Sequence, residues 1–278
     1  MASNFSPAYS QMFQEFFANN YQASGKLRGT TMELHGLVGD AYKMKYMGAQ
    51  YMDQHGAFGS DIPAKNVTTT APVLSFSDYE LKLAIDEFEQ LNMNASVLNG
   101  YAKTHAKAIG RREDQFIIDA VVADATLTVA AGGANLTYIK LLEARSNLGL
   151  NEVDDVLHVV LHWNNMQALL QQQQATSVDY FTQKTLVDGT MDMQKFIGFQ
   201  FHVIGNRNDE GGLPIDGANV RSVIVYAQDA VTLGYRMDPQ VRTVQVENNA
   251  RIETLSLMSA GAKVGDANGV GIIYCDET

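Results

Sequence analysis

Two histidines four residues apart, His158 and His162, are the best candidates for metal ligands in the sequence. They lie in the apolar segment 155–163, which we predict to be a β-strand. On a strand, residues four apart share a face but lie about 13 Å from each other, which is too far for one metal ion. A helix would bring them close enough to share a metal, although a third ligand would still be needed. We therefore expect both histidines to lie in the core or at an interface.

The other residues that could carry out chemistry show no informative spacing. Several carboxylates could form a catalytic pair, but nothing singles out two of them: Asp40, Asp53, Asp61, Asp86, Glu87 and Glu89. Cys275 is the single cysteine, and we expect an inert, small apolar side chain there. The sequence contains no phosphate-binding loop, zinc-binding helix or nucleophile elbow of the common kinds. It therefore predicts a protein that is not an enzyme and has neither a metal nor a cofactor.

The charge balance is acidic and shows no basic patch. The net charge is −11, and the densest basic stretch, Arg111–Arg112, is followed at once by Glu113 and Asp114. Proteins that grip DNA neutralise its phosphates with clustered Lys and Arg. We therefore expect a chain that could enclose DNA without binding it specifically. Charged residues make up only 18% of the chain, below the usual share of about 25%, which favours a surface that largely meets other protein.

Neither secretion nor membrane insertion is indicated. The N-terminal sequence lacks the basic and apolar regions of a signal peptide. No apolar run approaches the roughly 18 residues that span a bilayer. A single cysteine fits a reducing compartment during synthesis. We expect synthesis in the cytoplasm and no membrane partner.

The first 86 residues predict an arm and a long hairpin. Residues 1–30 form a polar arm in which Phe13, Phe16 and Phe17 have helical spacing. In segments 37–47 and 73–86, apolar and polar residues alternate. This pattern predicts two paired strands around a loose tip of about 25 residues. The residues expected to contact the partner strand and an adjacent subunit are Tyr42, Met44, Tyr46, Tyr79, Leu81 and Leu83. Because a two-stranded ribbon is only marginally stable alone, we expect this hairpin to lie on another subunit.

The rest of the chain predicts a long helix followed by a mixed region. A helix is expected over 94–124, with Asn94 as N-cap and Gly110 as a possible bend. The later segments are expected as helices at 136–149 and 164–174, strands at 155–163, 195–206, 222–231, 243–258 and 269–274, a hairpin turn at Asp188–Gly189, and a loop at 206–219. The order of these elements indicates an α+β fold.

Three stretches, together with this order of elements, resemble one family. They are "NASVLNGYAKTHAKAIGRREDQFIIDAVV" at 94–122, "TLVDGTMDMQKFIGFQFHVIGN" at 185–206 and "SAGAKVGDANGVGIIY" at 259–274. The chain resembles the major capsid proteins of tailed bacteriophages, which have the Hong Kong 97-like capsid fold. The resemblance implies an N-terminal arm at 1–30, an extended hairpin loop at 31–86, a peripheral domain with the spine helix at 87–135 and 236–278, and an axial domain at 136–235.

The resemblance also implies a function and partners. Subunits would assemble as hexamers and pentamers into the icosahedral head around double-stranded DNA, in the cytoplasm of a bacterial host. Because only about 30 residues precede the hairpin, we expect a separate scaffold protein. The resemblance also implies a portal, and it is compatible with decoration proteins. Lys65 lies in the hairpin tip, but we predict no covalent cross-link. Gly211 and Gly212 are expected in a loop that adapts at the symmetry axes.

Three alternatives share some of these features. An encapsulin-type compartment shell has the same fold but packages enzymes. A mixed α/β enzyme would need a clustered nucleophile or metal set, which the sequence does not offer. A phage tail or portal component would not be expected to have a long hairpin followed by a spine helix.

Overall fold

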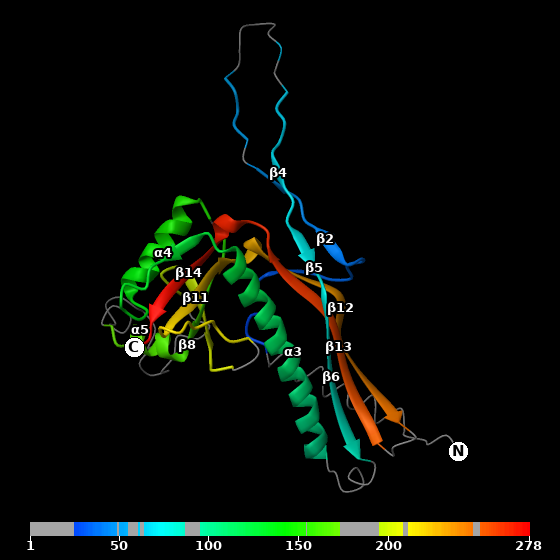
Figure 1. The fold of residues 1–278 in the computed structure, drawn as a ribbon. Coiled ribbons are helices and arrows are strands. Elements are labelled where there is room, and N and C mark those ends of the chain that lie inside the picture. Colours follow the sequence, from blue (N-terminus) through cyan, green and yellow to red (C-terminus); the bar gives the residue numbers. More distant parts are fainter. Residues whose placement is uncertain are drawn as a thin grey trace.

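The computed structural model describes most of the chain from residue 25 onward. The described residues are 25–48, 50–54, 61, 64–86, 95–153, 155–172, 195–207, 211–246 and 251–278. They form a four-stranded sheet, a six-stranded sheet, a projecting hairpin and a long helix that packs against both sheets (Figure 1). The predicted α+β class is therefore confirmed.

The long helix α3, Ala95–Asp124, is continuous over 30 residues and is therefore about 45 Å long at 1.5 Å per residue. It matches the predicted helix, whose proposed N-cap, Asn94, lies outside the described residues. Gly110 does not interrupt it. This glycine lies instead where residue 25 approaches the helix closely, since a β-carbon on Gly25 would be 3.4 Å from the Gly110 Cα.

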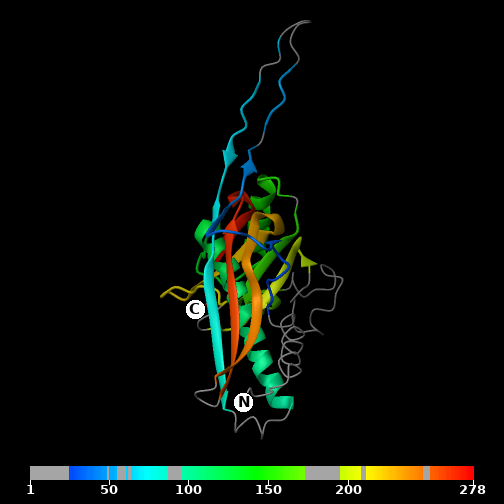
Figure 2. The same ribbon diagram turned by 90° about the vertical axis from the view of Figure 1, so that its right-hand side faces the viewer.

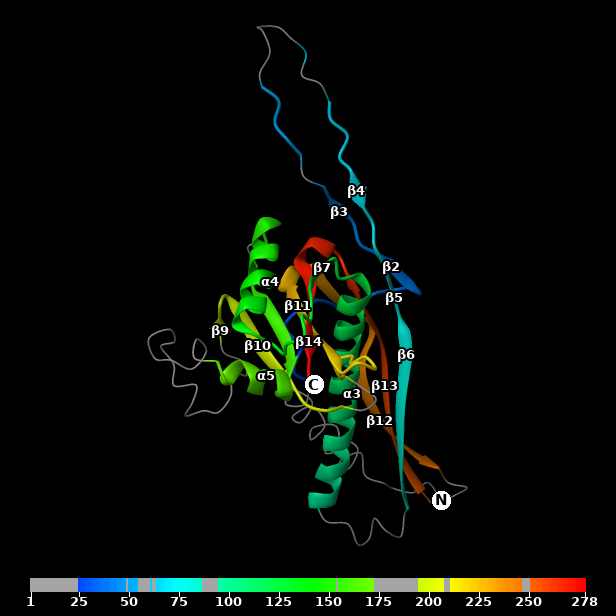
Figure 3. The ribbon, with the colours of Figure 1, turned by 60° about the vertical axis from the view of Figure 1, so that its left-hand side comes forward.

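The four-stranded sheet contains the longest strands. Its order is β1-β12-β13-β6, with bounds Met32–Leu34, Val231–Val246, Arg251–Val264 and Ser77–Asp86. β12 and β13 pair antiparallel, so the single strand predicted at 243–258 is the end of one strand and the start of the next. In Figure 3, α3 runs along this sheet.

The hairpin is shorter than predicted. β2 (Ala41–Lys43) pairs with β5 (Val73–Ser75), and β3 (Tyr46–Met47) pairs with β4 (Thr69–Thr70). The expectation that Tyr79, Leu81 and Leu83 face the other hairpin strand is wrong, because β6 pairs with β13 over ten register positions from Asp86 to Ser77. A long antiparallel ladder satisfies the backbone groups that an isolated ribbon would leave open.

The six-stranded sheet has the order β7-β14-β11-β8-β10-β9. Its strands are Leu127–Val129, Val270–Asp276, Val220–Ala227, Leu157–His162, Phe199–Ile204 and Lys195–Phe196. All six residues of β8 are buried, as the continuous apolar pattern predicts for a central strand. Helices α4 (Tyr138–Leu150) and α5 (Trp163–Leu170) accompany this sheet, and their predicted existence is confirmed.

One predicted strand contains a turn. Segment 195–206 was expected to be continuous, but Ile197 and Gly198 have φ angles of 54° and 81°, and β9 folds back on β10. Two consecutive positive φ values are typical of the tight hairpin turn that matches strand twist. An isoleucine at such a position gave no turn signal in the sequence.

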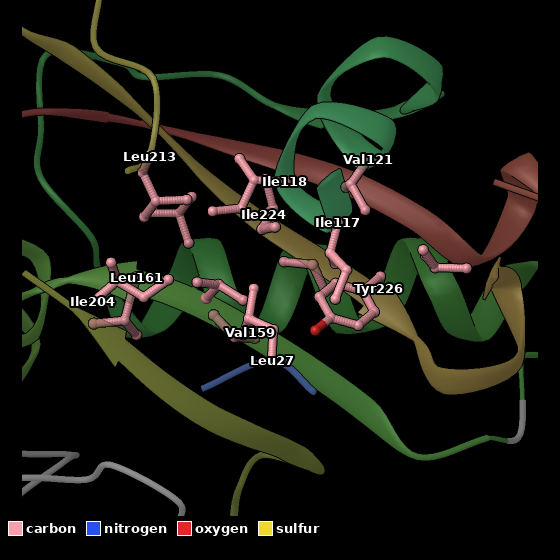
Figure 4. Packing of buried hydrophobic residues seen from close by; sticks show 14 of the residues in the cluster. Leu27, Ile117, Ile118, Val121, Val159, Leu161, Ile204, Leu213, Ile224 and Tyr226 are labelled. Atoms are coloured by element: carbon pink, nitrogen blue, oxygen red, sulfur yellow. The ribbon is translucent and has the colours of Figure 1, made fainter. Parts of the chain in front are cut away.

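The core lies where the C-terminal half of α3 meets the six-stranded sheet. Figure 4 shows Ile117, Ile118 and Val121 of this helix packed with Ile224 and Tyr226 of β11. Leu27 joins the same cluster from the chain before β1 (Figure 4). The helix therefore connects the two sheets. No helix within the described part of the chain is long and apolar enough to cross a bilayer.

Candidate assembly surfaces

The hairpin extends well beyond the rest of the molecule (Figure 2). Its two sides are joined by the β3–β4 pair and by the Gly48 N–H, which donates to the Thr68 carbonyl over 2.8 Å. Farther out, the Lys65 ammonium donates to the Tyr51 carbonyl and the Asp53 carboxylate at 2.7 and 2.8 Å. The apolar side chains along it have no cover, since Met52 is 99% and Tyr51 81% exposed. An exposed apolar ribbon of this kind indicates a contact surface.

The base of the hairpin is fixed to its own subunit. Leu74 is fully buried against Gly234 and Gly261 of the four-stranded sheet. Arg236 of β12 donates to Asp40 at 3.0 Å and to Asp78 at 2.6 Å, and so connects the hairpin base to the sheet. The direction in which the hairpin leaves the subunit is thus set by intrachain contacts.

The six residues predicted for the hairpin contact fall into two groups. Tyr42 is exposed on β2, while Met44 is buried in its own subunit and the Tyr46 ring lies against Gly265. Tyr79, Leu81 and Leu83 lie on β6 and are half-buried. The Tyr79 ring is 5.3 Å from that of Phe116 and lies under the Arg112 guanidinium at 4.6 Å.

A groove of about 290 Å³ runs between β6, β13 and α3. Its mainly apolar lining includes Tyr79, Leu81, Ile109 and Met258, with Arg111 and Arg112 at its side. The elements that line this groove, β6, β13 and α3, lie away from the projecting part of the hairpin beyond β4 (Figure 1).

The predicted adaptable loop contains two tightly packed glycines. Gly211 has φ +70°, and its N–H donates to the Gln115 side chain of α3 over 2.5 Å. A β-carbon there would lie 2.7 Å from the Arg111 carbonyl, and one on Gly212 would lie 2.5 Å from the Arg207 carbonyl. Close backbone approach therefore explains both glycines within the subunit.

Asp114 is a buried junction that sequence reasoning missed. Its carboxylate accepts from the Arg207 guanidinium at 2.6 Å and from the Leu27 N–H at 2.9 Å. Burial raises the pKa of Asp114, and the Arg207 charge opposes this shift. The contacts join the chain before β1, the spine helix and the loop after β10. Leu27 and Arg207 lie 87 and 93 positions from Asp114 in the sequence, so no local pattern indicates these contacts.

Other buried polar side chains also join elements. The His105 imidazole on α3 contacts the hydroxyls of Thr254, at 3.0 Å, and Ser256 on β13, and burial lowers the pKa of His105 to about 4. The Lys140 ammonium on α4 donates to the carbonyls of Ala131, Ala134 and Tyr274 at 2.7, 2.5 and 2.9 Å. These groups join separate elements within the subunit.

The histidines and the cysteine that the sequence offers as candidates for chemistry are buried. His158 is buried with its Nδ1 3.0 Å from the His202 Nε2, and burial lowers the pKa of His158 to about 4. His162 is also buried and caps α5, so the expectation of core histidines is confirmed. Burial raises the pKa of Cys275 to about 12, which keeps the thiol protonated and inert. Among the described residues, no three His, Cys, Asp or Glu side chains are grouped as metal ligands.

Some predicted residues lie outside the described ranges. These are Phe13, Phe16 and Phe17 in the arm and the turn at Asp188–Gly189.

A spine helix, a long-stranded sheet, a second mixed sheet and a projecting hairpin together define the Hong Kong 97-like capsid fold. Solved structures share it: Mycobacterium phage Che8 matches with a TM-score of 0.65 and 15% identity, over 92% of this chain and 90% of that one. The capsid of cyanophage P-SCSP1u matches with a TM-score of 0.68 and 15% identity, over 88% and 86%. A virus-like particle from Pyrococcus furiosus matches with a TM-score of 0.59 and 10% identity, over 95% and 99%.

The chain belongs to the phage capsid protein family, whose sequence model matches residues 5–277. It is a major capsid protein, a structural subunit of the virion that assembles into the capsid shell, as the resemblance implied. The family match favours this class over the encapsulin alternative. No curated protein matches the chain.

Proposed function

We propose that subunits assemble as hexamers and pentamers into an icosahedral head enclosing double-stranded DNA, and that each hairpin docks on a neighbouring subunit. The observation that carries this proposal is the hairpin, which projects with Tyr51 and Met52 uncovered. The groove between β6 and α3 is its proposed receptor, because an apolar tip and an apolar groove would each lose exposed surface on contact.

The predicted contact residues take distinct roles in this proposal. Tyr42 would contact the neighbour from the hairpin, and Tyr79, Leu81 and Leu83 would do so from the receiving strand. Met44 and Tyr46 would act through the hairpin base, where they contact their own subunit. Phe13 and Phe16 of the arm remain proposed contacts, and Gly211 and Gly212 would support a loop near the symmetry axes.

The proposed domain division takes its bounds from the resemblance, with two segments reassigned by sheet pairing. The resemblance gives the arm as 1–30, the extended loop as 31–86, the peripheral domain as 87–135 and 236–278, and the axial domain as 136–235. β7 and β14 belong to the six-stranded sheet, so we propose to move residues 127–129 and 270–276 from the peripheral to the axial domain. Its six-stranded sheet with α4 and α5 would then form one unit.

The proposed assembly takes place in the host cytoplasm with further partners. A separate scaffold protein and a portal are proposed from the family resemblance, and decoration proteins would bind the finished shell. Mass spectrometry of purified precursor and mature particles tests each partner, because a protein present at fixed stoichiometry in one particle form is a component of it. Particles built from this chain alone would contradict the proposed partners.

An engineered disulfide tests the docking of the hairpin. Met52→Cys and Leu81→Cys variants are prepared separately and co-assembled, so that any bond between them joins two subunits. The native Cys275 is buried and should not interfere. We expect covalent dimers in oxidised shells and none in unassembled subunits. Shells that form normally without such dimers would contradict this docking, and a chain that forms no shells would contradict the assembly itself.

A matched pair of substitutions tests the apolar character of the tip. Met52 makes almost no contact within its own subunit, so Met52→Asp should leave the urea unfolding midpoint of unassembled subunits unchanged. It should reduce particle yield at least tenfold, since a charge would be buried at the contact. Met52→Leu keeps the apolar surface and should assemble normally.

A further inference from the structure

The N-terminal half of α3 carries a basic face that is absent from the linear charge pattern. Residues 95–112 contain no Asp or Glu and four basic side chains, Lys103, Lys107, Arg111 and Arg112, of which Arg112 lies over the Tyr79 ring on the β6 side of the helix. In the sequence, Glu113 and Asp114 follow directly and were expected to cancel this charge. The structure places both carboxylates on the buried side of the helix, where Glu113 is 1% and Asp114 0% exposed.

Each of these carboxylates is used inside the subunit. Glu113 accepts from the Tyr235 hydroxyl at 2.5 Å, and Asp114 accepts from Arg207 and the Leu27 N–H. The Arg207 guanidinium offsets the charge of Asp114 inside the subunit. Both carboxylates are buried, so neither forms a direct pair with an exposed lysine of the helix.

The basic side chains form a row. Lys103, Lys107 and Arg111 are four residues apart and so lie along one side of a helix, about 6 Å apart along its axis. Both lysines are exposed, and neither has an ion pair with any residue that the structure describes. Exposed lysines at regular spacing, without an ion-pair partner among the described residues, are suited to a polyanion even in a chain of net charge −11.

We propose that this face of α3, with Lys103 and Lys107 at its centre, points into the shell and contacts the phosphates of the packaged DNA. The inference rests on the proposed function, because it requires a shell that encloses DNA. Charge complementarity supports it: ammonium groups bind phosphate oxygens without reading bases, so the contact is independent of sequence. A few lysines per subunit give weak binding individually, and this agrees with a chain that does not grip free DNA.

Two measurements on the same filled particles test this orientation. In the first, formaldehyde cross-links amines to DNA, and mass spectrometry of nuclease-treated peptides locates the modified lysines. We expect nucleotide adducts at Lys103 and Lys107, at least severalfold above those at the exposed Lys195 of β9. In the second, an amine reagent coupled to a carrier too large to enter the shell is added from outside. Lys103 and Lys107 should react only after disassembly.

A matched pair of variants links the adducts to charge. Lys103→Gln/Lys107→Gln particles should show at least a fivefold lower total yield of DNA–protein cross-links, whereas Lys195→Gln particles should keep the wild-type yield. Both variants should form shells, because these side chains are exposed in the subunit.

Three outcomes would overturn the inference while leaving the shell intact. They are reaction of Lys103 and Lys107 with the external reagent, adducts in filled particles at other lysines only, and cross-links of these lysines to an acidic protein instead of DNA. Absence of any shell would instead contradict the proposed function.

Discussion

The Leu74 side chain lies directly over Gly234, in the space that a β-carbon on this glycine would occupy. Gly261 is the register partner of Gly234 across the β12–β13 ladder, and the Ser75 carbonyl lies over it in the same way. Two facing glycines therefore form a notch in the four-stranded sheet that seats the base of the hairpin. This packing, together with the Arg236 ion pairs to Asp40 and Asp78, anchors the base of the long hairpin.

Filling the notch should destabilise the subunit. Gly234→Ala forces a methyl group against Leu74, and overpacking of this kind costs about 1–3 kcal/mol. Urea unfolding of unassembled subunits measures the loss. Gly217→Ala is the control, because a β-carbon at Gly217 meets no atom within 4 Å and should change stability by less than about 0.5 kcal/mol. Equal effects of the two substitutions would show that the notch is not closely packed.

The sequence predicted those elements whose signals are local. The helix at 95–124 and the buried strand β8 follow from periodicity and an apolar run, and both are found where expected. The pairing of β6 with β13 was missed because it joins residues about 170 positions apart. An alternating pattern indicates a strand but not the strand with which it pairs. The inward direction of Glu113 and Asp114 was missed for a related reason: charge was counted along the chain, whereas a helix separates neighbours by about 100°.

Removing Arg207 should be costly because it leaves Asp114 buried without its charged partner. The guanidinium nitrogen is 2.6 Å from a carboxylate whose side chain is fully buried. Breaking a buried pair in this way destabilises by about 3–5 kcal/mol, so Arg207→Ala should lower the free energy of unfolding by this amount in urea denaturation. Arg236→Ala is the comparison, since Asp40 and Asp78 are exposed and this change should cost about 1 kcal/mol or less. A loss as small for Arg207→Ala would mean that Asp114 does not depend on the ion pair.

Acid should destabilise the subunit through His105. Burial lowers the pKa of this imidazole to about 4 in the folded state, whereas the unfolded value is about 6.5. Above pH 6.5 both states are neutral, so His105 adds no pH dependence there. As the pH falls from 6.5 to 4, the unfolded chain binds a proton that the folded subunit does not, and stability falls by up to about 3 kcal/mol before levelling off.

A non-titrating variant isolates this effect from the carboxylates and from His158. His105→Gln retains polar atoms near Thr254 and Ser256 but binds no proton in this range. The difference in unfolding free energy between wild type and variant, measured by urea denaturation from pH 7 to pH 4, should shift against the wild type as the pH falls. A difference that stays constant over this range would show that His105 is protonated equally in both states.

Replacing Lys140 should loosen one edge of the six-stranded sheet. Its ammonium binds the carbonyls of Ala131, Ala134 and Tyr274, and so joins α4 to the segment after β7 and to β14. Burial lowers the pKa of Lys140, yet three carbonyl acceptors suit a protonated amine. Lys140→Met keeps a long apolar side chain but leaves these carbonyls without their donor, at a cost of about 1–3 kcal/mol.

Hydrogen exchange can distinguish this local effect from a general loss of stability. The Asp276 N–H donates to the Ala134 carbonyl over 3.1 Å, so it reports on the segment that Lys140 holds in place. In Lys140→Met, exchange at Asp276 should accelerate by about tenfold or more, which corresponds to about 1.4 kcal/mol of local opening. Amides of β12 and β13, in the other sheet, should change less. Lys195→Met is the control because Lys195 is exposed, and it should leave both regions unchanged. Equal acceleration in both sheets would mean that Lys140 supports the whole subunit rather than this edge.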